Sequence, residues 1–411
     1  MNNILVITYW DFQDALIQTY TLPYVRIIKK NLSDKSIVWL LTLEKNSKTM
    51  SADKRDQIKE SLFLEGIKWI SYSYNSFGFK ALLMWMKIIS SLIYIIICDK
   101  INVIHCWATP AGAIGYILSV LTRKPLVIDS YEPHAESMVE NGTWKKNGMA
   151  FKILFWLEKK QTQRAHTIIG ATEGMRHYAK EKYGYVPENF WVKPACVDMD
   201  LFSKDKIKKN SLLQELNLTD KIVCVYAGKF GGIYLENETF DFFKAAYDFW
   251  GNNFRIILLS SHTLKEIENY CASAGLNPAI IILKFVPHAQ VPDYMGLGDF
   301  AITPVKPVPT KRYCTPIKDG EYWALGLPVI IPQNISDDSE IIEENDAGVV
   351  IKNFQRSEYD SAVRKINELL SERFTERFSR INRIAHRYRS FKIAEQVYQS
   401  VYGKSLSKFG G

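Results

Sequence analysis

The chain has 411 residues, too many for one compact core, and this length favours two or three domains. Hydrophobic residues make up 47% and charged residues 23%, as in ordinary soluble globular proteins, with no low-complexity segment and no repeat of fixed period. The net charge of +8 would suit nucleic acid, but no recognition motif or dense basic run accompanies it. We therefore expect no nucleic acid partner, and an anionic membrane surface or a phosphate-bearing substrate instead.

Short β-branched runs alternate with longer helical patterns, which is typical of parallel α/β units. The predicted strands of the first half are Ile4–Thr8, Ile37–Leu43, Ile67–Ser71, Val103–Trp107, Leu126–Asp129, Thr167–Ala171 and Trp191–Pro194. After a lysine-rich hinge near Val197–Leu218, the predicted strands are Ile222–Ala227, Arg255–Ser260, Ile280–Phe285, Ala301–Pro304, Val329–Pro332 and Val349–Ile351. The sequence thus predicts two Rossmann-like, doubly wound domains facing a cleft, residues 1–200 and 201–385. Residues 386–411 are predicted to form a helix that crosses back to the first domain.

Two segments are candidates for contact with a membrane. Phe77–Lys100 is the most hydrophobic stretch, but Lys80 and Lys87 interrupt it and leave about half the uncharged length of a bilayer span. We expect a buried helix there, with a helix at the membrane surface as the alternative. Thr143–Arg164 mixes lysines with tryptophans and phenylalanines. This mixture predicts either a basic helix on an anionic membrane or a helix with one packed and one solvated face.

The amino terminus and the cysteines indicate the compartment. The chain begins "MNNILVITYW", which enters a predicted strand without the basic and apolar regions of a secretory signal. The six cysteines are scattered, and several lie in apolar runs such as "IVCVYAG", which favours reduced thiols over disulfides or a metal site. We therefore expect a cytoplasmic protein, with any membrane contact peripheral and on the inner face.

A glycine-rich turn follows the first predicted strand of the second domain, in "YAGKFGGIYLENE". Glycine turns allow backbone N–H groups to approach phosphate oxygens, and the start of the following helix adds a favourable dipole. Gly228 and Lys229 are therefore candidates for binding an anion, with Lys229 as the point charge. The spacing is neither that of a dinucleotide-binding Gly-x-Gly-x-x-Gly motif nor that of a P-loop.

A second candidate site lies in "TPIKDGEYWALGLPVI", Thr315 to Ile330. Pro316 suits the first turn of a helix, and Thr315 before it is placed to cap that helix. The free N–H groups there, including that of Ile317, and the side chain of Lys318 form a second end favourable to phosphate. Glu321 follows one turn later, where a carboxylate can accept two hydrogen bonds from a vicinal diol such as that of ribose.

These motifs occur in an order that resembles the nucleotide-sugar glycosyltransferases of the GT-B fold, most of all the retaining enzymes of glycosyltransferase family 4. The order is "YAGKFGG", "FVPHAQVPDYMGLGDFAITP", "TPIKDGEYWALGLPVI" and "EENDAGVVI". In the first half, "NVIHCWATPAGAIG", "PLVIDSYEPHAESM" and "VKPACVDMDLF" resemble the acceptor domain and the strand leading to the hinge. The resemblance spans nearly the whole chain and implies a GT-B fold with a sugar bound to UDP or GDP as donor substrate.

The resemblance assigns roles to individual residues. It places Glu321 on the donor ribose and Lys229 on the donor pyrophosphate, and it implies a wall around the nucleobase formed by Phe285, Val286 and Val291. In the first domain it places His134 or Asp129 near the reacting sugar, with Glu132 beside them as an acceptor contact. Since GT-B enzymes usually need no bound metal, it also implies no metal and no bound cofactor.

The chain departs from the family pattern at three places. Tyr313 stands where the family usually has a second glutamate, eight positions before Glu321. Leu235 stands where a second basic residue is usual, and we expect Lys311, Arg312 or Lys318 to replace its charge.

The third departure is the N-terminal loop "YWDFQDALIQTY", which lacks the usual glycine pair. Asp11, Gln13 and Asp14 make this loop polar enough to bind acceptor hydroxyls. The predicted function is therefore transfer of a sugar to a glycan hydroxyl, with a lipid-linked acceptor in surface-polysaccharide assembly suggested by analogy. The alternatives are a non-catalytic subunit that binds nucleotide sugar or glycan, and a sugar-nucleotide epimerase on the same fold.

Overall fold

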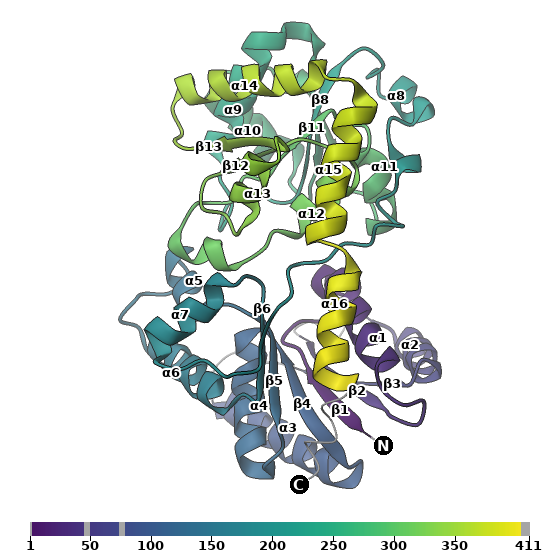
Figure 1. The fold of residues 1–411 in the computed structure, drawn as a ribbon, viewed down its shortest axis with the longest axis vertical. Coiled ribbons are helices and arrows are strands. Elements are labelled where there is room, and N and C mark those ends of the chain that lie inside the picture. Colours follow the sequence, from purple (N-terminus) through teal and green to yellow (C-terminus); the bar gives the residue numbers. More distant parts are fainter. Residues whose placement is uncertain (1, 45–49, 74–78, 404–411) are drawn as a thin grey trace. The chain divides into compact units, whose positions relative to one another are not determined.

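A computed structural model describes residues 2–44, 50–73 and 79–403, with the side chains of residues 79–82 outside the description. The chain divides into two compact units, residues 1–194 with 392–411, and residues 195–391 (Figure 1). Each unit is a parallel sheet with helices packed against it, so the predicted α/β architecture of two Rossmann-like units is confirmed. The chain crosses between the units at residues 194–195 and 391–392, a few residues from the boundaries expected from sequence.

The first unit contains a seven-stranded sheet in the order β3-β2-β1-β4-β5-β6-β7. Its strands are β1 (Asn3–Ile7), β2 (Val38–Glu44), β3 (Ile67–Ser73), β4 (Ile101–Trp107), β5 (Leu126–Tyr131), β6 (Thr167–Gly170) and β7 (Phe190–Val192). Its α-helices are α1 (Leu22–Lys30), α2 (Ala52–Leu64), α3 (Phe79–Cys98), α4 (Ala108–Thr122), α5 (His134–Glu140), α6 (Met149–Arg164), α7 (Gly174–Tyr183) and α16 (Phe391–Tyr398). Two π-helical segments, η1 (Leu16–Thr21) and η7 (Gln399–Gly403), complete the unit.

The second unit contains a six-stranded sheet in the order β10-β9-β8-β11-β12-β13. Its strands are β8 (Ile222–Ala227), β9 (Phe254–Leu259), β10 (Ile281–Lys284), β11 (Phe300–Ile302), β12 (Val329–Pro332) and β13 (Gly348–Ile351). Its α-helices are α8 (Asn210–Glu215), α9 (Asn237–Trp250), α10 (Leu264–Ala274), α11 (Val291–Met295), α12 (Ile317–Ala324), α13 (Asp338–Glu344), α14 (Arg356–Ser371) and α15 (Phe374–Tyr388). Short 3₁₀ turns are η2 (Lys204–Lys206), η3 (Gly251–Asn253), η4 (Pro278–Ile280), η5 (His288–Gln290) and η6 (Pro309–Tyr313).

The central strands of the second sheet are buried on both faces. Side chains alternate along a strand, so Val223 and Val225 of β8 belong to one hydrophobic cluster and Cys224 and Tyr226 to the other. Helices cover both faces of such a sheet, which is why its strands read as continuous apolar runs. That property made the strands recognisable in the sequence.

The C-terminal segment after α15 belongs to the first unit (Figure 1). Tyr398 of α16 and Tyr402 of η7 are both buried there. Tyr402 lies beside His105 of β4, with its hydroxyl 2.5 Å from the histidine Nδ1. The C-terminal tail thus supplies part of the core of the first unit, which begins almost 400 residues earlier in the chain, roughly the full length of the sequence.

Candidate functional site

In each sheet the strand order reverses beside the first strand of the unit, between β1 and β4 and between β8 and β11. Loops that leave neighbouring strands at such a point diverge to opposite faces of the sheet, and ligands of open α/β sheets bind in the crevice between them. The turns that follow β1 and β8 are therefore candidate binding sites.

The turn after β8 is held in place by its backbone. The Gly228 N–H donates to the carbonyl of Leu259 at 3.0 Å, and the Tyr226 hydroxyl donates to the carbonyl of Lys229 at 2.6 Å. Gly231 and Gly232 have φ values of +85° and +61°, which side chains rarely tolerate, so glycine is required there. The side chain of Lys229 itself is exposed and makes no hydrogen bond or ion pair with the described residues.

Helix α12 begins one residue later than expected. Pro316 is the N-cap residue and the helix starts at Ile317, so the prediction that Thr315 caps the helix is wrong. The hydroxyl of Thr315 instead accepts a hydrogen bond from the backbone N–H of Ala195 at 2.8 Å. Because that hydroxyl is occupied, no side chain caps α12 and the N–H groups of its first turn keep their capacity to bind an acceptor.

Glu321 lies one turn into α12 and is partly exposed. Its carboxylate has no hydrogen bond or ion pair with the described part of the chain. Burial raises the pKa of Glu321 to about 7, against the opposing effect of the Lys318 charge. A ligand that donates hydrogen bonds to the Glu321 carboxylate would therefore stabilise its charged form.

Lys318 joins the glycine turn to Glu321. A side chain on Gly228 would meet the Cε of Lys318 at 3.0 Å, so the stem of this lysine lies against the turn. The Lys318 Nζ lies 5.4 Å from the centre of the Tyr234 ring, in the segment that follows the turn. The structure thus brings together Gly228, Lys318 and Glu321, three residues that were predicted from two separate motifs.

The residues expected at the nucleobase follow β10 at the same edge of the sheet. Phe285 is 81% exposed, whereas Val286 and Val291 are partly buried and pack against the core of the second unit. Phe285 therefore presents an exposed aromatic ring on which a planar group could stack.

Asp129 of β5 is fully buried in the first unit and takes part in an ion-pair cluster. Its carboxylate lies 3.2 Å from Lys193 Nζ and 3.4 Å from His105 Nε2, and it accepts a hydrogen bond from the Tyr398 hydroxyl at 2.5 Å. Burial alone would raise the pKa of Asp129, but the charges and hydrogen bonds around it keep this pKa below its usual value. These contacts fix the carboxyl end of β5 and leave the Asp129 side chain inaccessible to solvent.

His134 lies at the start of α5 with its side chain 29% exposed. Its Nδ1 is 3.3 Å from Glu132 Oε1, so the structure brings these two predicted residues together. The next backbone N–H, that of Ala135, donates to the buried carboxylate of Glu158 at 2.9 Å. Burial raises the pKa of Glu158 to about 7, and nearby hydrogen-bond donors and His134 oppose the rise.

The loop after β1 carries Asp11, Gln13 and Asp14 at the other switch point. Gln13 is exposed, while the Asp14 carboxylate accepts a hydrogen bond from the N–H of Leu16. The loop is anchored by buried Glu44, which accepts a hydrogen bond from the Phe12 N–H at 3.2 Å. Burial raises the pKa of Glu44, and the neighbouring Asp11 carboxyl adds to this effect.

Several residues that shape these loops were missed by sequence reasoning. Tyr322, next to Glu321, accepts a hydrogen bond from the Ala227 N–H at 3.2 Å and so ties α12 to the end of β8. Lys306 donates to the carbonyl of Gly232 at 2.8 Å. Lys193 lies buried beneath the β5 loop. A lysine in the run "FWVKPACV" was the one available signal, since it follows a predicted strand and precedes the hinge.

Comparisons with known proteins agree with this geometry. Residues 308–400, which include α12, match the family described as "Glucosyltransferase 3-like, C-terminal domain". The structure is similar to that of Anabaena Alr3699/HepE in complex with UDP, with a TM-score of 0.69, 15% identity and 98% and 99% of the two chains covered. The chain has the GT-B glycosyltransferase fold. The resemblance inferred from sequence is therefore confirmed, and glycosyltransferase family 4 fits it.

Two further relatives extend the comparison for this GT-B chain. Sucrose-phosphate synthase from Thermosynechococcus elongatus has a TM-score of 0.71 at 12% identity, covering 99% of this chain and 100% of that one. The alpha-D-kanosaminyltransferase of Streptomyces kanamyceticus is 19% identical over 277 residues. That match covers 64% of this chain and 66% of the relative, just under two thirds of its length. The two solved structures share the fold with this chain at low sequence identity.

Proposed function

We propose that this protein is a glycosyltransferase that moves a sugar from a nucleoside diphosphate donor, such as a UDP- or GDP-sugar, to an acceptor hydroxyl. The observation that carries the proposal is the partly exposed carboxylate of Glu321, which has no hydrogen bond or ion pair among the described residues and lies near Lys318, whose stem packs against the Gly228 turn. A ribose diol would donate two hydrogen bonds to Glu321, and the diphosphate would meet the turn and the uncapped start of α12. The complex of HepE with UDP supports a nucleotide donor.

In this reaction the bond between the anomeric carbon and the diphosphate breaks, a bond from that carbon to the acceptor oxygen forms, and the hydroxyl proton passes to the departing diphosphate. The second unit would stabilise the departing diphosphate through Lys229, Lys318 and backbone N–H groups of the turn. In the first unit, His134 and Glu132 would contact the reacting sugar, with Asp129 beneath them as support. Retention of configuration and the absence of a required metal are part of the proposal through the resemblance to family 4.

The central test replaces the carboxylate. Glu321→Gln should weaken UDP binding by about 1.5–3 kcal/mol, the value of a charge-assisted hydrogen bond. Titration calorimetry with UDP measures it, and Glu268→Gln, an exposed glutamate of α10, serves as the matched control. Unchanged UDP affinity in Glu321→Gln would refute the assignment of Glu321 to the ribose.

The pH dependence gives an independent check. Since hydroxyl donors favour the carboxylate form and the pKa of Glu321 is raised to about 7, nucleotide binding should release protons near neutrality. UDP affinity should therefore fall as the pH drops below 7, and Glu321→Gln should lose that part of the dependence. A pH dependence identical in both proteins would contradict this role.

Activity distinguishes the enzyme from a binding subunit. A panel of UDP- and GDP-sugars is incubated with the protein and nucleotide release is measured, with Lys229→Ala as the variant. Lys229→Ala should raise the activation free energy of the reaction by about 2.7–4 kcal/mol, as the loss of other single electrostatic contacts does. Nucleotide binding without release from any donor would favour the non-catalytic alternative, and turnover of Lys229→Ala within a few-fold of wild type would remove Lys229 from the mechanism.

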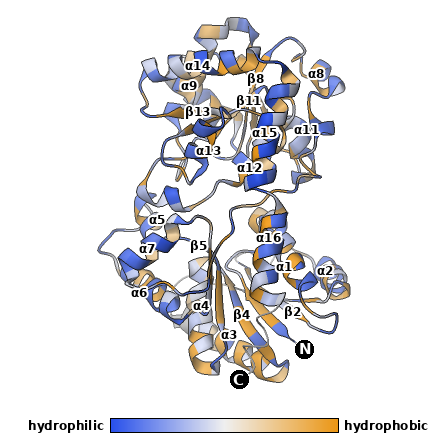
Figure 2. Cartoon of the chain, in the orientation of Figure 1, coloured by the Kyte–Doolittle hydropathy of each residue, from blue (hydrophilic) through white to orange (hydrophobic). Residues whose placement is uncertain are grey.

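We further propose that the first unit docks on an anionic membrane, where a lipid-linked glycan would be the acceptor. Helix α4 lies between α3 and α6 and contacts both. The three helices expose ten large apolar side chains: Leu83, Met86, Tyr94, Ile97, Ile117, Val120, Leu121, Met149, Ile153 and Trp156. Hydrophobic residues run along α3 in Figure 2. We call these residues the apolar face.

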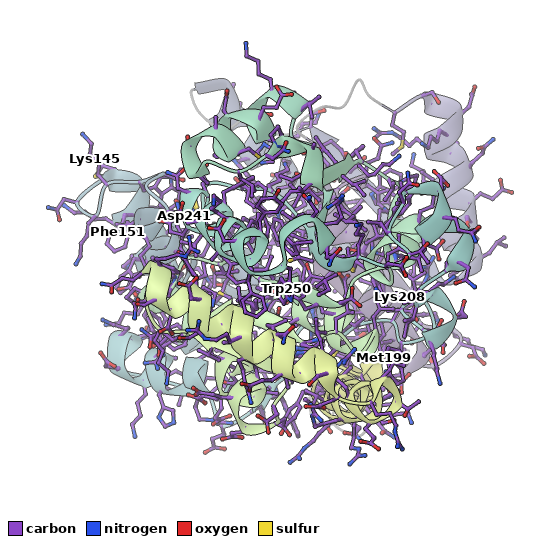
Figure 3. The ribbon with its side chains drawn as sticks, turned by 90° about the horizontal axis from the view of Figure 1, so that it is seen from above. Lys145, Phe151, Met199, Lys208, Asp241 and Trp250 are labelled. Carbon is purple, nitrogen blue, oxygen red and sulfur yellow. The ribbon has the colours of Figure 1, made fainter. Side chains whose placement is uncertain are left out.

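Helix α6 carries the charge that fits this face to anionic lipid. It buries polar residues, Glu158, Gln161 and Thr162, and exposes Ile153 and Trp156 to solvent. Exposed lysines lie on α6 at positions 152 and 159 and just before it at positions 145 and 146. Figure 3 shows Lys145 pointing outward from the protein. Lysines beside exposed apolar rings are typical of helices at a membrane surface, and among the described residues no helix is long and apolar enough to span one.

Sedimentation with liposomes tests this docking. We expect binding to vesicles containing phosphatidylglycerol at low salt, weaker binding at high salt, and loss of binding in Ile153→Glu/Trp156→Glu. Leu264→Glu, which changes an exposed apolar residue of α10 in the other unit, should bind as wild type does. Absence of sedimentation at every salt concentration would overturn the membrane proposal and leave the glycosyltransferase proposal standing.

A further inference from the structure

The glycine turn after β8 is held by a histidine from the neighbouring strand. His262 follows β9, and its Nε2 accepts a hydrogen bond from the backbone N–H of Phe230 at 2.9 Å. Phe230 lies within the turn, between Lys229 and Gly231, and is itself 5% exposed. The contact therefore fixes the middle of the segment that carries Gly228 and Lys229.

The bond requires a particular form of the histidine. Because Nε2 accepts a proton, the ring must be neutral and carry its hydrogen on Nδ1. The Nδ1 atom faces Glu266 Oε2 at 3.5 Å, which favours that tautomer. The Glu266 carboxylate is in turn fixed by the backbone N–H and hydroxyl of Thr263, at 2.7 and 2.8 Å, in a capping box at the start of α10.

Ring packing reinforces the hydrogen bond. The Phe230 and His262 rings stack with their centres 5.7 Å apart, and Tyr270 of α10 packs edge-on against both. The hydroxyl of Tyr270 donates to Glu236, the residue before α9, at 3.0 Å. His262 and Tyr270 thus hold the turn at its middle and at its end.

We propose that His262 is a positioning residue for the donor diphosphate, acting through the Phe230 amide to fix the backbone that would contact the phosphates. This inference rests on the proposed function, because the turn is taken to bind a nucleotide. A second N–H on the His262 ring, at Nε2, would face the Phe230 N–H, so only the neutral ring with its hydrogen on Nδ1 can hold the turn. The titratable groups that face the ring are Glu266 and Tyr270 on α10, and the charged residues of the turn nearest to it in sequence are Lys229 and Glu236.

The experiment compares three histidine variants. His262→Phe keeps the stacked ring and removes the acceptor, while His262→Gln supplies an amide oxygen close to the position of Nε2. His386→Phe, an exposed histidine of α15, is the control. Hydrogen exchange of a peptide spanning residues 226–236 is measured without nucleotide, and UDP affinity is measured by calorimetry from pH 8 to pH 5.

In His262→Phe we expect faster exchange in the peptide and about tenfold weaker UDP binding at pH 8. His262→Gln should bind UDP at pH 8 within about threefold of wild type, since it restores the acceptor. Exchange and UDP affinity that are both unchanged in His262→Phe would overturn the inference. If wild type does not bind UDP while exchange still rises in His262→Phe, the positioning of the turn stands and the proposed donor falls.

Discussion

The buried cluster around Asp129 yields a prediction about stability. Asp129 and Lys193 are both fully buried, with 3.2 Å between the carboxylate and Nζ. At an effective dielectric constant of about 20, two unit charges at that distance attract with about 5 kcal/mol. Asp129→Asn removes the negative charge and leaves the buried Lys193 charge without its carboxylate partner, which typically destabilises a protein by about 3–5 kcal/mol.

Thermal unfolding measures the effect. For a unit of this size, 1 kcal/mol corresponds to about 2–4 °C, so the unfolding temperature of the first unit should fall by roughly 6–20 °C. Replacing both charges, in Asp129→Asn/Lys193→Met, should recover at least half of the loss because no unpaired charge remains. Asp99→Asn is the control, since Asp99 forms a surface pair with Lys68 at 3.8 Å and should cost about 1 kcal/mol or less.

The pH dependence of this difference follows from the lowered pKa of Asp129. A carboxylate with a depressed pKa stabilises the folded state above its unfolded pKa, and this contribution is lost as the pH falls through the folded pKa. The gap between wild type and Asp129→Asn should therefore close on acidification. An Asp129→Asn protein as stable as wild type at neutral pH, or a double variant no better than the single one, would refute the reasoning.

Two further predictions concern the buried side of α12. Burial and the neighbouring Asp338 carboxyl raise the pKa of Asp319, so Asp319→Asn should gain stability relative to wild type as the pH rises from 4 to 8, measured by urea unfolding; a constant difference would contradict this. A Cβ on Gly320 would lie 2.7 Å from Val197 and 2.9 Å from Arg389, so Gly320→Ala should cost about 1–3 kcal/mol in thermal unfolding, and a neutral result would show that the contact relaxes.

Most strands were predictable because burial on both faces makes them continuous apolar runs. Each predicted strand overlaps an observed one, including the edge strand β10. The start of α12 was predicted wrongly because local capping rules gave the Thr315 hydroxyl to the helix, whereas Ala195, 120 positions away, occupies it. Local sequence patterns carry no information on such distant partners.

In the candidate site too, the residues identified by local spacing were predictable and those that depend on distant partners were not. The roles given to Glu321 and Lys318 depended on local spacing, and the structure places Lys318 against the glycine turn and within electrostatic reach of Glu321. His262 was missed because its partner is a backbone N–H, which has no sequence signature. The family resemblance placed Asp129 near the reacting sugar, whereas its burial among Lys193 and Tyr398 involves residues far away in sequence.

The return of the C-terminal tail has a consequence for how the protein is made. Tyr398 and Tyr402 are synthesised only after all of residues 195–391, which form the other unit. During translation, Asp129 and His105 therefore lack their tyrosine partners until the second unit has left the ribosome. The first unit to begin synthesis is therefore the last to be completed.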